Sequence, residues 1–537
     1  MTTRSSDEMP RRGIDWTTRD RERARHFDPS GRWCRGAALA REGVVMALAA
    51  SVWASGTIGV DVYGATGANC VESFSRGSAG YSLVSEPWLP VLTTSGMRSC
   101  GLSGVFDPDV IAIATGDDLE DAALTRLLLA IHIAATECGL VPQEWVDVHR
   151  SGFDLFDVHR PFWQNPGMAQ FAKFPGAVRP LVSASYRHAG RGSTAVNVWH
   201  NASELVFDSG AAARLLVVRQ QFSVGGKQPF TTAAYGSSPM SAKTSVATIR
   251  PFLWLDDGRL ASSLAATAAL SGTHPVGQFW FTWPRHARPA DTGCPSGVLD
   301  GLTWQSRSML LFRGGGDIGP GIMVCDGLRW PEFGDVDAPL EPVLVPHTIY
   351  CRPDGSDRYV PQRVHPERPA WHQLAVMCAD PHYPGGQSVS RPTSPSGYPR
   401  WRLGGLGAYQ AAISGPITAS FPVPADPSGL RDVLTEMSLA YRRIGSVTAA
   451  LAKAVSGFAG YRAAIPSHTG CQAELEVIAA DVATGRLSPS HAVTLIEAIA
   501  DSTISQAYQS VAQVRPVAAA RVAVQKPRHH ASKKHTT

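Results

Sequence analysis

A glycine-rich run from Gly314 to Gly319 is the first segment whose residue types and spacing could do chemistry. GxGxxG spacing after a strand lets dinucleotide-binding proteins bring backbone close to a pyrophosphate at the N-terminus of the next helix. Here Pro320 and Gly321 follow, and another β-rich run comes next instead of a helix. We therefore predict a glycine-rich hairpin loop at this place and no bound cofactor.

Other catalytic patterns are missing from the sequence, which contains no P-loop, no HExxH pair and no GxSxG nucleophile elbow. Asp154 and Asp157 lie in an aromatic segment, and we expect them to cap backbone or form ion pairs rather than to work as catalytic carboxylates. His529, His530 and His535 lie near the C-terminus, where metal binding would be nonspecific. No catalytic residue and no metal site is predicted; the open alternative is a nuclease or hydrolase with an unrecognised site.

Composition limits the classes of protein that remain. The chain has 537 residues, 44% of them hydrophobic, which is enough for a sizeable core and more than one domain. Its formal net charge is only +4, from 49 Lys and Arg against 45 Asp and Glu. A protein that wraps nucleic acid alone is usually more basic, so any contact with nucleic acid should be local or shared with partner subunits.

Cysteine usage and hydropathy indicate a cytoplasmic protein. The 9 cysteines are an odd number, are widely spaced and form no CxxC pair, which argues against a disulfide framework and a structural zinc site. No run reaches the roughly 18 apolar residues of a membrane span. The apolar run at 44–53 follows about forty residues, many of them charged, far beyond a normal signal-peptide n-region.

Helices and strands are predicted from local spacing. Residues 117–138 form an amphipathic pattern that Asp117 or Asp118 can cap, and residues 209–222 form a second helical pattern. Between residues 230 and 425, short β-rich runs alternate with Pro and Gly turns. The predicted strands are 279–283, 308–312 and 322–324.

After residue 425 the composition changes to Ala- and Leu-rich helical patterns at 430–458, 471–484 and 488–514. The predicted fold class is therefore α+β, with a large mixed N-terminal domain of short strands and helices followed by a C-terminal antiparallel helical bundle. We predict four regions: an N-terminal extension at 1–80, the mixed domain at 81–425, the bundle at 426–515 and a basic tail at 516–537.

Two motifs resemble a known family. The segment Phe153-Asp-Leu-Phe-Asp-Val-His-Arg-Pro-Phe-Trp-Gln164 resembles "FDLFDPERPF-Q", and Ser82-Leu-Val-Ser-Glu-Pro-Trp-Leu-Pro-Val91 resembles "LLDEPWIPV". Both patterns belong to the CasA family, the large subunit of the type I-E CRISPR surveillance complex Cascade. Physically, the segment at 153–164, the second of the two motifs along the chain, is an aromatic and acidic loop anchored at a domain edge, with Pro161 restricting its backbone. The resemblance covers about residues 81–515.

This resemblance implies a non-catalytic subunit that recognises the protospacer-adjacent motif (PAM) in double-stranded target DNA. It would start strand separation for R-loop formation and recruit the helicase–nuclease that degrades the target. The implied partners are the crRNA within Cascade and the backbone and small subunits of that complex. A purely structural scaffold subunit is the remaining alternative.

The resemblance assigns the PAM contacts first to a glycine loop. The family lays the backbone of such a loop against the minor groove, and the segment from Ser223 to Lys227 takes its place. Gly226 matches the better of two contact positions, Gly225 precedes it, and Ser223 departs from glycine at the other. A hydroxyl there could narrow the range of PAM sequences. From the residues alone, the alternative is a helix C-cap with a left-handed glycine.

A second element is the hairpin that carries a wedge glutamine in the family. Residues 407–413 resemble its "G-x-x-N-N-Q-A-x-I" pattern and place the wedge at Gln410, with groove contacts at Tyr409 and Ala411. Tyr409 replaces an asparagine and could stack on a splayed base instead. The alternative from composition is a packed segment of small residues with Gln410 facing solvent.

Weaker correspondences complete the predicted interface. Asn197 and Trp199 lie where the family has a loop that touches the PAM and the crRNA 5′ end, and a buried Trp199 beside a surface Asn197 is the alternative. Arg329 is the basic residue near the place of a PAM-contacting lysine. Arg352 and Arg358, on a predicted hairpin, would hold the displaced strand unless they are ordinary solvated arginines.

Overall fold

The fold is described from a computed structural model of the chain. The structure describes residues 80–172, 177–187, 207–227, 241–242, 244–272, 274–279, 293–313, 321–331, 345–351, 360–364, 370–379, 399–409, 412–454 and 471–512. The extension at 1–79 and the basic tail at 516–537 lie outside these ranges.

A three-stranded antiparallel sheet begins the described chain, in the order β2-β1-β3. Its strands are β1 (Leu89–Thr93), β2 (Gly96–Cys100) and β3 (Val110–Ile113). The long helix α4 (Asp118–Glu137) follows, and its leucines and alanines are almost fully buried in the main core. Asp117 caps α4 as predicted, because its side chain accepts hydrogen bonds from the backbone of Leu119 and Glu120. The short helix α5 (Pro142–Val148) comes next.

The two motifs that resemble the family pair with each other. Ser82 and Asp154 form an antiparallel bridge, and Leu83 donates to the carbonyl of Phe153 at 2.8 Å. Phe153 and Phe162 are fully buried in the main core. These buried rings anchor the segment, whereas Val158, His159 and Arg160 at its turn are exposed. Its position at a domain edge stays a prediction.

The two aspartates of that segment have structural roles, as predicted. The Oδ1 atom of Asp154 accepts hydrogen bonds from the backbone N–H groups of Tyr81 and Phe156. Asp157 accepts from the N–H groups of His159 and Arg160 in the same way. These local bonds hold the turns of the segment.

The second predicted helix is α7 (Ser209–Gln221), which packs against α4 and β8. Strand β8 (Arg307–Phe312) forms an antiparallel hairpin with β9 (Gly321–Asp326), and the two-residue strand β4 (Arg179–Pro180) joins β9. The GxGxxG run therefore connects two antiparallel strands, which confirms a hairpin in place of a dinucleotide site. The predicted strand at 279–283 lies outside the described residues from 280 onward.

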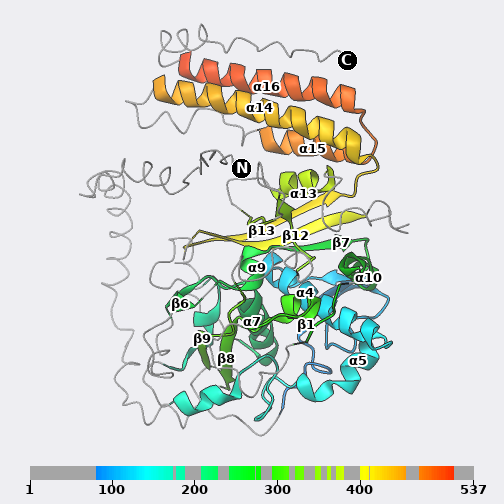
Figure 1. Cartoon of the computed structure of the whole chain (residues 1–537), viewed down its shortest axis with the longest axis vertical. Helices are drawn as coiled ribbons and strands as arrows, with labels where there is room; N and C mark the ends of the chain where they lie inside the picture. The colour runs from blue at the N-terminus through cyan, green and yellow to red at the C-terminus, as the bar shows by residue number, and fades with distance from the viewer. Residues whose placement is uncertain are drawn as a thin grey trace, which may run out of the picture. The chain divides into compact units, whose positions relative to one another are not determined.

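A long hairpin forms the centre of a second antiparallel sheet, in the order β13-β12-β7 (Figure 1). Its strands are β7 (Phe252–Asp256), β12 (Arg400–Tyr409) and β13 (Ala412–Pro422). Side chains alternate between two faces along β12, as the pleat requires. Gly404 approaches Ala122 of α4, whereas Trp401 and Leu403 face a second core.

Three long helices end the described chain: α14 (Pro427–Ala454), α15 (Gln472–Ala483) and α16 (Pro489–Ala512). They pack on one another, as predicted, and the second core joins them to β12, β13 and helix α13 (Ala370–Ala379). Figure 1 shows α13 between this bundle and the long hairpin.

The remaining elements are short. They are η1 (Arg150–Gly152), η2 (Pro166–Phe171), η3 (Leu181–Ala184), β5 (Gly226–Lys227), β6 (Ser241–Ala242), α9 (Val246–Ile249), α10 (Leu260–Ala268), η5 (Ala269–Ser271), α11 (Val298–Thr303), β10 (Tyr350–Cys351) and β11 (Val360–Pro361). Within the described ranges no single helix is long and apolar enough to cross a membrane; the bent pair α4 and α5 meets that test only when the two are taken together.

Candidate nucleic-acid interface

The predicted glycine loop begins directly after α7, but no glycine caps that helix. Its C-cap residue is Phe222, with φ −121° and ψ 75°, and the N–H of Phe222 donates to the carbonyl of Val218. The glycines come three and four residues later, and Gly226 lies in strand β5, paired with Ala242 of β6. The C-cap alternative is therefore wrong, and the glycines belong to an extended segment that leaves the helix.

Ser223 anchors the base of this loop. Its side chain is 0% exposed, and its hydroxyl donates to the carbonyl of Arg219 at 2.5 Å. Its own carbonyl accepts the N–H of Ser245, the residue before α9, at 2.8 Å. The hydroxyl that was expected to narrow PAM readout is thus occupied inside the protein. Ser223 can act on a ligand only through the loop that it holds in place.

The hairpin predicted to carry the wedge lies on the other side of α9, which packs against β12. Strand β12 ends at Tyr409 and β13 begins at Ala412, and these two residues are paired across the hairpin. Gln410 and Ala411 lie outside the described residues, as does the side chain of Tyr409. Helix α9 thus joins two predicted PAM elements that are far apart in the sequence.

Arg329 lies half-buried just after β9, and its carbonyl accepts the N–H of Gly293. Nearby Asp326 is buried, which raises the pKa of its carboxyl group, and the charges of Arg307 and Arg329 oppose that rise. A cavity of about 10 Å³, large enough for one water molecule, lies between Asp326 and Arg329. Arg329 therefore contributes to local electrostatics inside the protein.

The remaining predicted contacts fall outside the described residues. Asn197 and Trp199 lie in the stretch between Arg187 and Phe207, and Arg352 and Arg358 lie between the paired strands β10 and β11. The hairpin predicted for the two arginines is confirmed at its strands. The contacts of all four side chains stay predictions.

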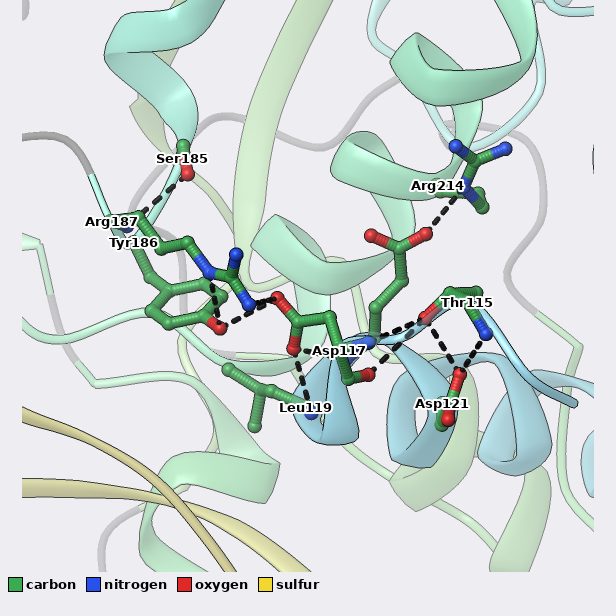
Figure 2. Close-up of polar contacts among 9 residues, drawn as sticks. Thr115, Asp117, Leu119, Asp121, Ser185, Tyr186, Arg187 and Arg214 are labelled. Atoms are coloured by element: carbon green, nitrogen blue, oxygen red, sulfur yellow. Dashed lines mark hydrogen bonds and ion pairs between the residues drawn. The ribbon is translucent and has the colours of Figure 1, made fainter. Parts of the chain in front are cut away.

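The described residues just before that first stretch are tied firmly to α4 (Figure 2). The hydroxyl of Tyr186 donates to Oδ2 of Asp117 at 2.7 Å, and Arg187 forms an ion pair with the same oxygen at 2.5 Å. Burial, together with the hydrogen bond to Asp117, raises the pKa of Tyr186. One end of the stretch that carries Asn197 and Trp199 is therefore attached to the N-terminus of α4.

The other end of that stretch is attached through α7. Asp208 caps α7 by accepting the N–H of Ala211, and Arg214 forms an ion pair with Glu120 of α4. Arg214 also donates to the carbonyl of Trp88 at 2.9 Å. The tryptophan of the first family motif thus helps to place α7, and with it the start of the glycine loop.

Buried arginines beneath the loop were missed by sequence reasoning. Arg307 is 1% exposed, and its pKa is lowered to about 9, mainly by burial and also by the charge of Arg219. Burial likewise lowers the pKa of Arg126 in α4 to about 9. Their signal in the sequence is an arginine inside an apolar run, as at Leu124-Thr125-Arg126-Leu127. That pattern predicts a buried charge but does not identify the groups that it contacts.

Metal chemistry finds no support in the described part of the chain. Within it, no group of three or more His, Cys, Asp and Glu side chains gathers where it could hold a metal ion. A cavity of about 430 Å³ is lined in part by arginines and carboxylates from β12, β7 and α4 that pair with one another or with neighbouring hydroxyl groups.

Comparisons with known proteins identify relatives of this chain. The curated CRISPR-associated protein CasA/Cse1 of Thermus thermophilus is 25% identical over 323 residues, or 55% of this chain, and the match spans 60% of that protein's length. The crystal structure of Cse1 from Acidimicrobium ferrooxidans superposes with a TM-score of 0.59 at 20% identity, covering 83% of this chain and 96% of that one. A chain from a structure titled "CRISPR RNA-guided surveillance complex" gives 0.62 at 17% identity, covering 83% and 98%.

At these identities the solved structures show a shared fold. The family model described as CRISPR-associated protein Cse1 matches residues 82–481, which is most of the chain and begins at the first of the two motifs. The protein therefore belongs to the CRISPR-associated Cse1 (CasA) family, as the resemblance of its two motifs predicts.

Proposed function

We propose that the chain is the large subunit of a type I-E Cascade complex, and that it recognises the PAM in double-stranded DNA and starts strand separation for R-loop formation. The observation that carries this proposal is the arrangement around α9. The glycine loop and the predicted wedge hairpin attach to the same short helix, within a fold shared with a chain of a surveillance complex.

Recognition would occur through backbone in the minor groove. The minor groove distinguishes A·T from G·C pairs but few other features, so backbone contacts there tolerate several PAM sequences. Gly225 and Gly226 lack a Cβ atom and permit close approach of the loop to the duplex. Arg329, Asn197 and Trp199 would supply side-chain contacts around the same base pairs.

Strand separation would begin at the hairpin. Unstacking the first base step costs a few kcal/mol, whereas later exchange of DNA pairing for guide pairing is nearly balanced. A side chain at Gln410, inserted below the PAM with Tyr409 and Ala411 in the groove, would lower that first barrier. Arg352 and Arg358 would then hold the displaced strand by phosphate contacts.

The proposed partners are those of the complex: crRNA, the backbone and small subunits, target DNA and the helicase–nuclease that the complex recruits. We assign no chemical step to this chain and place the complex in the cytoplasm. Incubation of the purified protein with labelled DNA and Mg²⁺ tests the alternative enzyme, since cleavage by this chain alone would contradict a purely recognising role.

The test of the recognition role compares two variants in the reconstituted complex. Gly226→Asp should weaken binding to PAM-containing duplex about tenfold or more at fixed salt, because a carboxylate would clash with and repel the groove. Gln410→Ala should slow opening of an intact duplex but leave binding to DNA with a pre-opened bubble nearly unchanged. Binding is measured by fluorescence anisotropy and opening by a base analogue next to the PAM.

Matched controls are available elsewhere in the chain. Gly445→Asp adds the same charge in α14, where a Cβ meets nothing within 4 Å, and Gln509→Ala removes an exposed glutamine of α16. Neither should change PAM-dependent binding. Equal losses on intact and pre-opened DNA for Gln410→Ala would instead support the scaffold alternative, and unaltered PAM affinity in Gly226→Asp would remove the glycine assignment.

A further inference from the structure

The peptide that precedes the glycines is held by a buried guanidinium. Arg307, the first residue of β8, donates from Nη2 to the carbonyl of Val224 at 2.9 Å and from Nη1 to the carbonyl of Ser306 at 2.6 Å. Its side chain is almost fully shielded from water. A hydrogen bond from a charged donor in such surroundings is stronger than a neutral one, so the Val224 carbonyl has a fixed direction.

Arg307 is itself held in position from two sides. Gln220 of α7 donates to the carbonyl of Arg307 at 2.8 Å and accepts its N–H at 2.9 Å. The same amide group donates to the carbonyl of Trp163 at 3.1 Å, so Gln220 also binds the family motif at 153–164. In the strand register, the backbone of Arg307 lies opposite that of Asp326 across the β8–β9 hairpin. The backbone from which the guanidinium extends is therefore fixed to α7 and to β9.

Because each peptide group is planar, these bonds also determine the direction in which the N–H groups of the loop point. In a trans peptide the C=O and N–H groups point in opposite directions. The carbonyls of Ser223 and Val224 both point inward, to Ser245 and Arg307. The N–H groups of Val224 and Gly225 therefore point away from these anchors, and neither donates a hydrogen bond to another group of the described part of the chain.

We propose that Arg307 is a positioning residue for PAM recognition: by holding the Val224 carbonyl inward it presents the N–H groups of Val224 and Gly225 to acceptors in the minor groove. This inference rests on the proposed function. Adenine N3 and thymine O2 are the acceptors that every A·T pair offers there. Arg307 acts through the loop and touches no DNA itself.

The test is Arg307→Met in the reconstituted complex, which keeps much of the side-chain volume but removes the donors. Binding is measured on duplexes with a functional PAM and with a scrambled PAM. We expect about tenfold weaker binding to the PAM duplex, corresponding to one lost hydrogen bond of a fixed donor, and unchanged binding to the scrambled duplex. Arg307→Lys retains a single donor and should give an intermediate loss.

Arg126→Met is the matched control, because Arg126 is similarly buried and donates to the carbonyls of Gly301 and Leu302 and to Oε1 of Gln221 in α7, but to none of residues 223–226. It removes the same charge and should lower thermal stability comparably while leaving the PAM preference intact. In the isolated protein, hydrogen exchange in a peptide that covers residues 222–227 should become faster in Arg307→Met only.

The outcomes separate the inference from the proposed function. If the wild-type complex shows no PAM preference, the proposed function itself fails. If the wild-type complex prefers the PAM and folded Arg307→Met retains that preference in full, the positioning role is overturned. The same conclusion follows if Arg126→Met loses the preference to the same degree, because the effect would then arise from charge or stability alone.

Discussion

At the scale of single residues, His347 shows how burial sets a protonation state. It is 1% exposed, and its Nε2 atom lies 3.2 Å from the carbonyl of Thr267 and 3.3 Å from Oγ of Ser271. The pKa of His347 is lowered to about 3, mainly by burial and to a smaller extent by the nearby charge of Arg126. The hydrogen bond to Thr267 opposes that change without reversing it. The ring is therefore neutral in the folded protein.

This histidine should make the free energy of unfolding depend on pH. Between about pH 6.5 and pH 3 the unfolded chain binds a proton at this position that the folded chain does not, so stability falls as pH falls. At pH 5 the loss relative to pH 7.5 should be about 2 kcal/mol from this group. Urea titrations of wild type and His347→Gln at both pH values measure it. The variant should show a smaller decrease, and the exposed His159→Gln should behave like wild type.

At the scale of elements, the N-terminus of α4 joins segments that local sequence does not connect. Asp117 caps the helix through the N–H groups of Leu119 and Glu120, and it also binds Tyr186 and Arg187. The cap is predictable from spacing within one turn. The contacts with Tyr186 and Arg187, which follow η3, depend on tertiary packing and cannot be predicted from that spacing. One carboxylate thus serves a helix end and the anchor of a neighbouring stretch.

Substitutions at Asp117 should separate these two roles. Asp117→Ala removes both and should lower the free energy of unfolding by about 2 kcal/mol, from a lost cap and a lost charged hydrogen bond. Asp117→Asn keeps a cap oxygen and should cost about half as much. Thermal unfolding of the two variants checks the order. Asp118→Ala, in the same first turn but without a backbone N–H partner, should stay close to wild type; an equal loss there would assign the effect to helix charge.

At the scale of the whole molecule, the second core decides which parts unfold together. Phe421 of β13 is fully buried and stacks on Trp371 of α13, with ring centroids 6.4 Å apart. It belongs to the apolar cluster that includes Leu434 and Leu475 of the helical bundle. We propose that the boundary near residue 426 separates the mixed domain from the helical bundle along the sequence. Because the two sides of that boundary share apolar contacts, they should not unfold independently.

Phe421→Ala tests this coupling. Removing a buried ring should cost about 3–5 kcal/mol. As temperature rises, proteolytic cleavage in the sheet region and in the helices of 427–512 should increase together. Mass spectrometry of the fragments measures cleavage in each region. Leu439→Ala, at a site that is 47% exposed, provides the control and should leave both regions protected. Selective loss of the helices in Phe421→Ala would show instead that they unfold alone.

Local spacing in the chain predicted the long helices, the α4 cap and the hairpin at the glycine-rich run, because turns, caps and side-chain periodicity depend on residues a few positions apart. The two motifs also indicated the family. One local interpretation failed: the C-cap glycine after α7, because the helix ends at Phe222.

The sequence by itself determined the family, the long helices and the hairpin of β8 and β9, and it indicated the loops where recognition was expected. Only the tertiary structure decided that the Ser223 hydroxyl is consumed by Arg219, that α9 joins the loop to the hairpin, and that Arg307 holds the carbonyl of Val224. The physical reason is distance along the chain: a buried donor is satisfied by whichever carbonyl packing brings near it, and residues 224 and 307 meet only after α7 and β8 have packed together.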